Sequence, residues 1–207
     1  MKTLELFNGT GSIGKAFKEL GHDVFSVDFE QRFNPDLCKD IMELQLSEIP
    51  FKPDVVWASP PCQAFSVAVI GRNWYEGMPS SWNAIKGISM LYKTLWMIDQ
   101  YKLKYWFIEN PRGMMRKLEA MKDFKRNEVS YCQYGDSRMK PTDIWSNIFL
   151  DLKICKNGIS CHDAQPRGYS KKKRIGAIGK GTQGLRNAEE RGMIPHKLCL
   201  QIASKCV

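Results

Sequence analysis

The sequence lacks the long apolar run that a membrane-spanning helix needs. No stretch approaches roughly 18 uncharged apolar residues, and the start "MKTLELFNG" has no apolar centre of the kind found in secretory signal peptides. We therefore expect a cytoplasmic protein with no membrane partner.

The sequence also lacks the paired cysteines of a disulfide framework. Its seven cysteines are odd in number, scattered, and include no CxxC pair, a pattern typical of a reducing compartment. Cys155, Cys161 and His162 could form part of a metal site. No fourth ligand stands at a useful spacing, so ordinary roles are favoured and no metal is expected.

The sequence has fewer acidic than basic residues, and the segment 165–186 has no acidic residue at all. The chain carries 31 Lys and Arg against 22 Asp and Glu, a net charge of +9, and residues 165–186 hold seven Lys or Arg, five Gly and no acidic residue. This segment is either a solvated loop or a contact for phosphate backbone. Beside a nucleotide-binding core the second interpretation is favoured, with Lys171, Lys172, Lys173 and Arg174 as the contacts.

Strand and helix patterns alternate along the chain, whose 207 residues and 43% hydrophobic content suffice for one main domain. The alternation predicts a Rossmann-like α/β fold, a mostly parallel sheet flanked by helices, with ligands at the carboxyl ends of its strands. Strands are expected at 2–7, 23–28, 53–60, 104–109, 126–134 and 143–149, and helices at 12–20, 83–101 and 187–206. Residues 1–150 would form the core, 151–186 a small basic segment, and 187–207 a helix that packs back on the core.

A glycine loop follows the first expected strand. The stretch "LFNGTGSIG" fits the G-x-G-x-x-G pattern, and Asp28 stands 19 residues after Gly9. Glycine at positions 9 and 11 lets backbone approach a ligand closely, and the next helix offers free N–H groups to an oxygen-rich partner. The pattern fits NAD, FAD or S-adenosylmethionine equally, or a purely structural turn.

Two further motifs end buried strands. In "ASPPCQAFS", two prolines stiffen the approach to Cys62, which predicts a nucleophilic thiol rather than a small buried hydrophobe. In "YWFIENPRG", Glu109 follows an apolar run, so burial is expected to let its carboxyl hold or deliver a proton. The alternative for "ENP" is a surface helix cap.

Together these motifs resemble the DNA (cytosine-5)-methyltransferase family. "LFNGTG" is similar to its cofactor loop, "PPCQAFS" to its Pro-Cys catalytic loop, and "ENP" to its Glu-Asn-Val signature. The resemblance implies that Asp28 binds the ribose of S-adenosylmethionine and that Asp40 meets its adenine. The implied cofactor contacts are Phe7, Asn8, Gly9, Gly11, Ser12, Ile13, Asp28, Phe29, Asp40, Ile41 and Pro60, and the implied nucleic-acid contacts include Gln63, Ser66, Arg72 and Lys140.

The chain departs from the family pattern in two places. A Gln-x-Arg-x-Arg motif follows a Tyr-Gly pair in the family, whereas "QYGDSRMKPTDIW" keeps only Arg138 and Lys140 after the pair. Of these we expect Arg138 to be the more important contact, and we count it with the catalytic residues. Only some 40 residues separate Asn147 from Asn187, where the family carries a sizeable target-recognition domain, so sequence specificity should be short, relaxed or supplied by a partner.

The implied mechanism is methyl transfer to carbon five of cytosine in DNA. Cys62 adds to ring carbon six while Glu109 hydrogen-bonds or protonates ring nitrogen three, on a base flipped out of the duplex. An RNA or tRNA cytosine methyltransferase, a nicotinamide oxidoreductase and a non-catalytic nucleic-acid-binding relative remain alternatives. A small monomer of this kind would suit a phage or mobile element and act in the cytoplasm of a bacterial or phage-infected cell.

Overall fold

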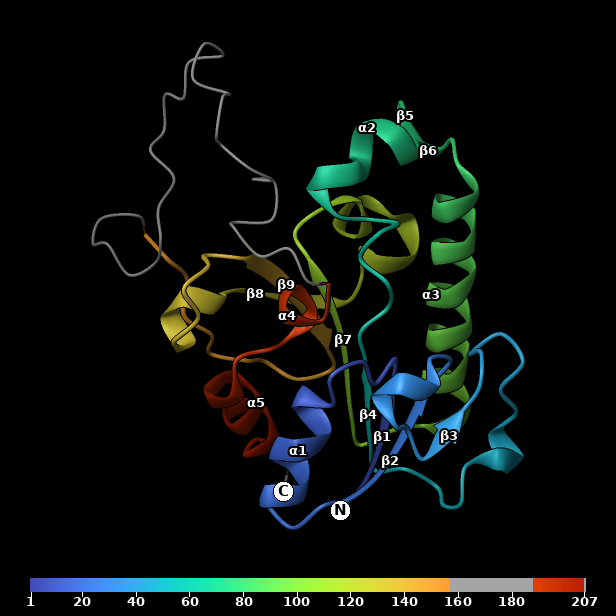
Figure 1. Ribbon diagram of the computed structural model, residues 1–207, viewed down its shortest axis with the longest axis vertical. Helices are drawn as coiled ribbons and strands as arrows, with labels where there is room; N and C mark the ends of the chain where they lie inside the picture. The colour runs from blue at the N-terminus through green and yellow to red at the C-terminus, as the bar shows by residue number, and fades with distance from the viewer. Residues whose placement is uncertain (157–187, 207) are drawn as a thin grey trace.

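A seven-stranded sheet forms the centre of the computed structural model, which describes residues 1–156 and 188–206 (Figure 1). Its strand order is β3-β2-β1-β4-β7-β9-β8. The strands are β1 (Lys2–Leu6), β2 (Asp23–Asp28), β3 (Leu37–Cys38), β4 (Val55–Ala58), β7 (Tyr105–Pro111), β8 (Lys125–Ser130) and β9 (Pro141–Ser146). From β3 to β7 all neighbours are parallel, and β9 runs antiparallel to β7 and β8. The prediction of a mostly parallel α/β fold is confirmed.

Helices cover both faces of the sheet. Figure 1 shows α1 (Ser12–Glu19) and α5 (His196–Ala203) together on one side and α3 (Trp82–Tyr101) on the other. Strand β4 shows why both faces need cover: Val55 and Trp57 enter the core cluster of α1 and α5, whereas Val56 and Ala58 enter the cluster of α3. Successive side chains of a strand point to opposite faces, so an all-apolar strand must be buried on both sides. None of the helices in the described ranges has the length and apolar character that a membrane crossing requires.

The end of the chain differs from the single helix expected over 187–206. The structure has two helices, α4 (Ala188–Gly192) and α5, with Pro195 at the start of the second. Proline has no N–H to continue a helix, but its carbonyl accepts from the backbone N–H groups of Leu198 and Cys199. Helix α5 then packs against α1, and the two share Ile13, Phe17, Leu198 and Ile202 in one core cluster.

Two strand predictions were also too long. Strand β8 ends at Ser130, and a short 3₁₀ helix, η6 (Tyr131–Tyr134), follows it where the strand was expected to continue. The strand expected over 143–149 is β9, which begins at Pro141 and ends at Ser146. The other 3₁₀ helices are η1 (Gln31–Phe33), η2 (Leu46–Glu48), η3 (Val67–Val69), η4 (Met114–Lys117) and η5 (Glu119–Met121).

The segment between β4 and α3, expected as a long irregular connection, is partly ordered. It contains α2 (Ile70–Asn73) and a hairpin of β5 (Trp74–Tyr75) and β6 (Met78–Pro79). The Asn73 amide donates to the Gln63 carbonyl and the Trp74 indole N–H donates to the Ala64 carbonyl, each at 2.7 Å. These bonds fix the backbone that directly follows Cys62.

Helix α3 approaches the same backbone at Gly87. A β-carbon built at position 87 would lie 2.2 Å from the Ala64 β-carbon. Only a residue without a side chain lets α3 pack this closely against the chain that follows Cys62.

We expect Gly87→Ala to destabilise the protein. Because the β-carbon would clash severely, overpacking should cost about 3 kcal/mol, and the gain in helix propensity returns roughly 1 kcal/mol. The net loss of about 2 kcal/mol should lower the melting temperature by about 4 to 8 °C. Gly71→Ala is the matched control, because a β-carbon there meets nothing within 4 Å. Equal melting temperatures for the two variants would contradict this packing argument.

A buried carboxyl in β1 should make stability depend on pH. Glu5 is 3% exposed, and burial raises its pKa to about 7 against the opposing effect of the Gly14 and Ile13 backbone N–H groups. The folded state therefore holds the proton more tightly than the unfolded state, whose pKa is near 4.5. The stability that the protonated Glu5 contributes is complete below pH 4.5 and is lost as the pH rises through about 7.

Glu5→Gln should remove that dependence. The wild type should lose about 2 kcal/mol of its free energy of unfolding between pH 5 and pH 8 because Glu5 ionises. The variant should not show this loss, because its amide has no proton to release. Denaturant unfolding at both pH values measures the difference, with the exposed Glu43→Gln as control. A constant offset between Glu5→Gln and the wild type at the two pH values would refute the assignment.

Candidate active site

A cavity of about 300 Å³ opens at the carboxyl ends of β1, β4 and β7. Parallel neighbours end at the same edge of a sheet, which is where ligands bind in such folds. The cavity brings together ten of the residues singled out from the sequence. Its lining includes Phe7, Asn8, Gly9, Ser12, Ile13, Pro60, Cys62, Gln63, Glu109 and Lys140.

The glycine loop forms one wall of the cavity. Gly9 and Gly11 have φ angles of +48° and +64°, a region that glycine adopts without strain. The Gly9 N–H donates to Asp28 Oδ2 at 2.8 Å, and the Glu30 N–H donates to Asp28 Oδ1 at 2.9 Å. Gly11 precedes α1 and provides no side-chain cap. The Ile13 and Gly14 N–H groups at the start of the helix hydrogen-bond the buried Glu5 carboxyl.

The turn after β4 presents Cys62. The Asn110 amide, fully buried at the end of β7, donates to the Pro60 carbonyl at 2.8 Å. The backbone N–H groups of Phe65 and Ser66 donate to the Cys62 carbonyl at 3.1 and 2.9 Å. The turn is therefore held on both sides of the cysteine, whose side chain is exposed to the cavity.

Glu109 and Lys140 line the same cavity as Cys62. Glu109 is 6% exposed, and its Oε1 accepts a hydrogen bond from the Tyr131 hydroxyl at 3.0 Å. The Lys140 ammonium lies 4.5 Å from the centroid of the Tyr131 ring and donates to the Arg191 carbonyl at 2.9 Å.

The charges of these groups influence one another. Although its side chain is exposed to the cavity, Cys62 is partly desolvated by the walls, which raises the pKa of the thiol; Lys140 lowers it and Glu109 raises it further. Burial lowers the pKa of Lys140, against the attraction of Glu109. The resting thiol is therefore protonated at neutral pH, and Lys140 is the nearby charge that favours its ionisation.

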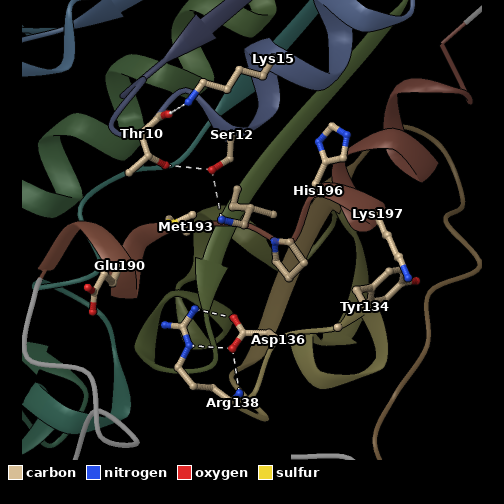
Figure 2. A pocket seen from close by; sticks show the side chains of 13 residues that line it. Thr10, Ser12, Lys15, Tyr134, Asp136, Arg138, Glu190, Met193, His196 and Lys197 are labelled. Carbon is tan, nitrogen blue, oxygen red and sulfur yellow. Dashed lines mark hydrogen bonds and ion pairs between the residues drawn. The ribbon is translucent and has the colours of Figure 1, made fainter.

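Arg138 lies outside this cavity. It lines a neighbouring cavity of about 760 Å³ that contains neither Cys62 nor Glu109. Figure 2 shows its guanidinium directed at Asp136, with which it forms an ion pair of 2.5 Å. Burial opposes ionisation of Asp136, but hydrogen bonds from Arg138 outweigh it and lower the pKa of that carboxyl. In the larger cavity, the buried Arg138 guanidinium is therefore already paired with Asp136.

Several other residues singled out from the sequence do not line this cavity. Asp28 holds the glycine loop from below, Phe29 is 57% exposed at the end of β2, and Ile41 belongs to the core. Asp40 lies 3.8 Å from Lys86. The remaining positions are Gly11 at the start of α1, Ser66 bridged to Gly113, and the exposed Arg72 in α2.

Some positions fall outside the described ranges. Lys171, Lys172, Lys173 and Arg174 do, as do Cys161 and His162, whereas Cys155 is buried. Within residues 1–156 and 188–206, no group of three or more His, Cys, Asp or Glu side chains is placed to hold a metal ion.

The cavity also contains residues that the sequence reasoning missed. Glu5 reaches its floor from β1, and its only signal was a charged residue inside the apolar run "LELF". Arg32 lies at the rim and pairs with Glu189 of α4 at 2.5 Å. Arg191 and Ile194 line the cavity from the same C-terminal segment, which no local motif placed there.

Comparison with known proteins agrees with this geometry. Residues 1–131 match the family model for C-5 cytosine-specific DNA methylases. Over its full length the chain is 29% identical to a Frog virus 3 (isolate Goorha) protein named "Probable DNA (cytosine-5)-methyltransferase", all of which it covers. It is 29% identical over 59% of its length to the type II methyltransferase M.FnuDI of Fusobacterium nucleatum, of which it covers 36%.

A solved structure supports the fold. The Entamoeba histolytica methyltransferase EhMeth superposes with a TM-score of 0.51 at 14% identity, over 75% of this chain and 57% of that one. The chain therefore spans all of its viral relative but only part of the bacterial and amoebal proteins. Because the family match extends over well more than half of the sequence, and includes the glycine loop, Cys62 and Glu109, the chain belongs to the C-5 cytosine-specific DNA methylases.

Proposed function

We propose that the protein transfers a methyl group from S-adenosylmethionine to carbon five of cytosine in DNA, through a covalent bond between the base and Cys62. One observation carries the proposal: Cys62, Glu109 and Lys140 line the same cavity as the glycine loop. A nucleophile, a proton carrier and a cation thus stand beside a site suited to a nucleoside.

The residues of the glycine loop fit S-adenosylmethionine. Gly9 and Gly11 let the loop backbone approach such a ligand closely, and Asn8, Thr10 and Ser12 line the cavity beside it. The Asp28 carboxylate already accepts two backbone N–H groups, yet it keeps lone pairs for ribose hydroxyls. When bound, the cofactor supplies an electrophilic methyl group.

Cys62 makes carbon five of the cytosine reactive. The thiolate forms a bond to ring carbon six, and the electrons of the carbon five–carbon six double bond move through the ring toward nitrogen three, where Glu109 hydrogen-bonds or delivers a proton. The base then has an enamine-like, nucleophilic carbon five. After methylation a base removes the proton from that carbon, the ring double bond re-forms, and Cys62 leaves as thiolate. A proton delivered to nitrogen three returns to Glu109 in the same step.

We assign the cation beside the base to Lys140 rather than Arg138. Lys140 lines the cavity and acts electrostatically on both Cys62 and Glu109. Arg138 faces Asp136 in the neighbouring cavity. A positive charge beside Cys62 favours the thiolate, and the same charge offsets electron density that builds up on the ring during attack.

The target base has to leave its stack to reach Cys62. The segment from Pro60 to Trp82 continues directly from the catalytic turn, and we propose that Gln63, Ser66 and Arg72 of this segment contact the nucleic acid around the flipped base. The basic segment would add backbone affinity. DNA is the substrate that the family favours, and a monomer would suffice because all three chemical groups come from one chain.

The decisive measurement is transfer of labelled methyl from S-adenosylmethionine to duplex DNA, single-stranded DNA and tRNA. Wild type should produce 5-methylcytosine in DNA, and Cys62→Ala should fall to about a thousandth of that rate or below, since removing a nucleophile abolishes the covalent route. Cofactor affinity, measured by calorimetry, should stay within about twofold because only the sulfur is removed.

The control is Cys38→Ser, which keeps a donor at an exposed position outside the cavity and should retain activity. Label in tRNA alone would change the substrate class to RNA. Tight cofactor binding with no label in any substrate would contradict the proposal and favour a partner-dependent or catalytically inactive relative.

A further inference from the structure

Tyr131 contacts both Glu109 and Lys140 without lining the cavity of Cys62. It begins η6, directly after β8, and its side chain is fully buried. Its hydroxyl donates to Glu109 Oε1 at 3.0 Å, and its ring lies under the Lys140 ammonium at 4.5 Å. Neither the Pro-Cys loop nor the "ENP" motif includes this residue.

The backbone holds Tyr131 in place from two sides. Its N–H donates to the Met139 carbonyl at 2.9 Å, and its carbonyl accepts from the Asp136 N–H at 3.3 Å. These bonds close the loop that runs from Tyr131 to Lys140. The aromatic ring is therefore fixed relative to the cation that lies over it.

The hydroxyl is a donor at any working pH. Burial raises the pKa of Tyr131 well above its ordinary value, and the nearby Glu109 raises it further. A buried hydroxyl needs a hydrogen-bond partner, and the Glu109 carboxyl is one that gains strength from charge. This bond fixes the position of Oε1 and so orients the Glu109 carboxyl.

We propose that Tyr131 is a positioning residue, which fixes Glu109 through its hydroxyl and seats Lys140 on its ring so that both face a flipped cytosine. This inference rests on the proposed function, because it assigns Glu109 to ring nitrogen three. Tyr131 itself does not line the cavity, so it acts through its two neighbours. It orients the carboxyl and the cation with one rigid side chain.

Tyr131→Phe tests the hydroxyl while keeping the ring under Lys140. We expect the kcat for methyl transfer to fall about 10- to 100-fold, as the loss of one charge-assisted hydrogen bond predicts. The KM for DNA and the Kd for S-adenosylmethionine should stay within about threefold, because neither binding surface changes. Thermal unfolding run in parallel shows whether the variant is folded.

Tyr134→Phe is the matched control. Tyr134 lies in the same 3₁₀ helix and is also buried, but its hydroxyl accepts from the Lys153 N–H at 3.2 Å and lies outside the cavity of Cys62. Its kcat should remain within about threefold of the wild type. A purely structural contribution of buried tyrosine hydroxyls would lower both variants alike and so overturn the inference.

Exchange of the cytosine carbon-five hydrogen isolates the step. Addition of Cys62 to carbon six makes carbon five exchange its hydrogen with solvent, so release of tritium from DNA labelled at that carbon reports attack without methyl transfer. Tyr131→Phe should slow this release by the same factor as kcat. In a Glu109→Gln background, the added Tyr131→Phe change should cost less than about threefold, because the two residues act as one unit.

Two results separate this inference from the proposed function. An active wild type with unchanged kcat in Tyr131→Phe, or equal losses with and without Glu109, would overturn the role of Tyr131 alone. A wild type with neither methyl transfer nor tritium release would overturn the proposed function and this inference together.

Discussion

One buried hydrogen bond joins the two chemical halves of the site. The Asn110 amide at the end of β7 donates to the Pro60 carbonyl in the turn after β4. The strands are parallel neighbours, so their ends already lie side by side. The pairing of the two strands ends at Ala58 and Ile108, and this bond extends the connection beyond it. Because Asn110 follows Glu109 directly and Pro60 stands two residues before Cys62, the bond holds the Pro-Pro-Cys turn against the end of β7.

The surroundings of that bond explain why Cys62 is exposed but not loose. Asn73 and Trp74 hold the carbonyls of Gln63 and Ala64, and α3 packs on the same backbone at Gly87. The turn is thus fixed by its backbone contacts, while the Cys62 thiol remains open to the cavity. Preorganisation of this kind avoids the free-energy cost of arranging a nucleophile during the reaction.

The sequence was sufficient for three groups at the carboxyl ends of neighbouring strands. The glycine loop, Cys62 and Glu109 lie at or just after the ends of β1, β4 and β7, and the parallel topology places these ends at one edge. The sequence-based predictions were wrong where an expected element ended earlier than its residue pattern indicated. Pro195 divides the last helix, and Arg191 and Ile194 come to the cavity from a C-terminal segment that carries no local motif. Tyr131 was assigned to a strand, where alternation gives no hint that its hydroxyl meets Glu109.

Lys140 stands where the family motif has its second arginine, and its contact with Tyr131 offers a physical explanation for this difference. A guanidinium offers several N–H donors in a rigid fork, whereas an ammonium is a compact charge on a flexible stem. Lysine alone would keep the charge beside Glu109 and lose the directional donor. The Tyr131 hydroxyl supplies that donor at 3.0 Å, and its ring gives the flexible ammonium a fixed seat. Two residues can therefore divide between them the charge and the direction that one arginine combines, which is why the altered motif is compatible with an intact Cys62 and Glu109.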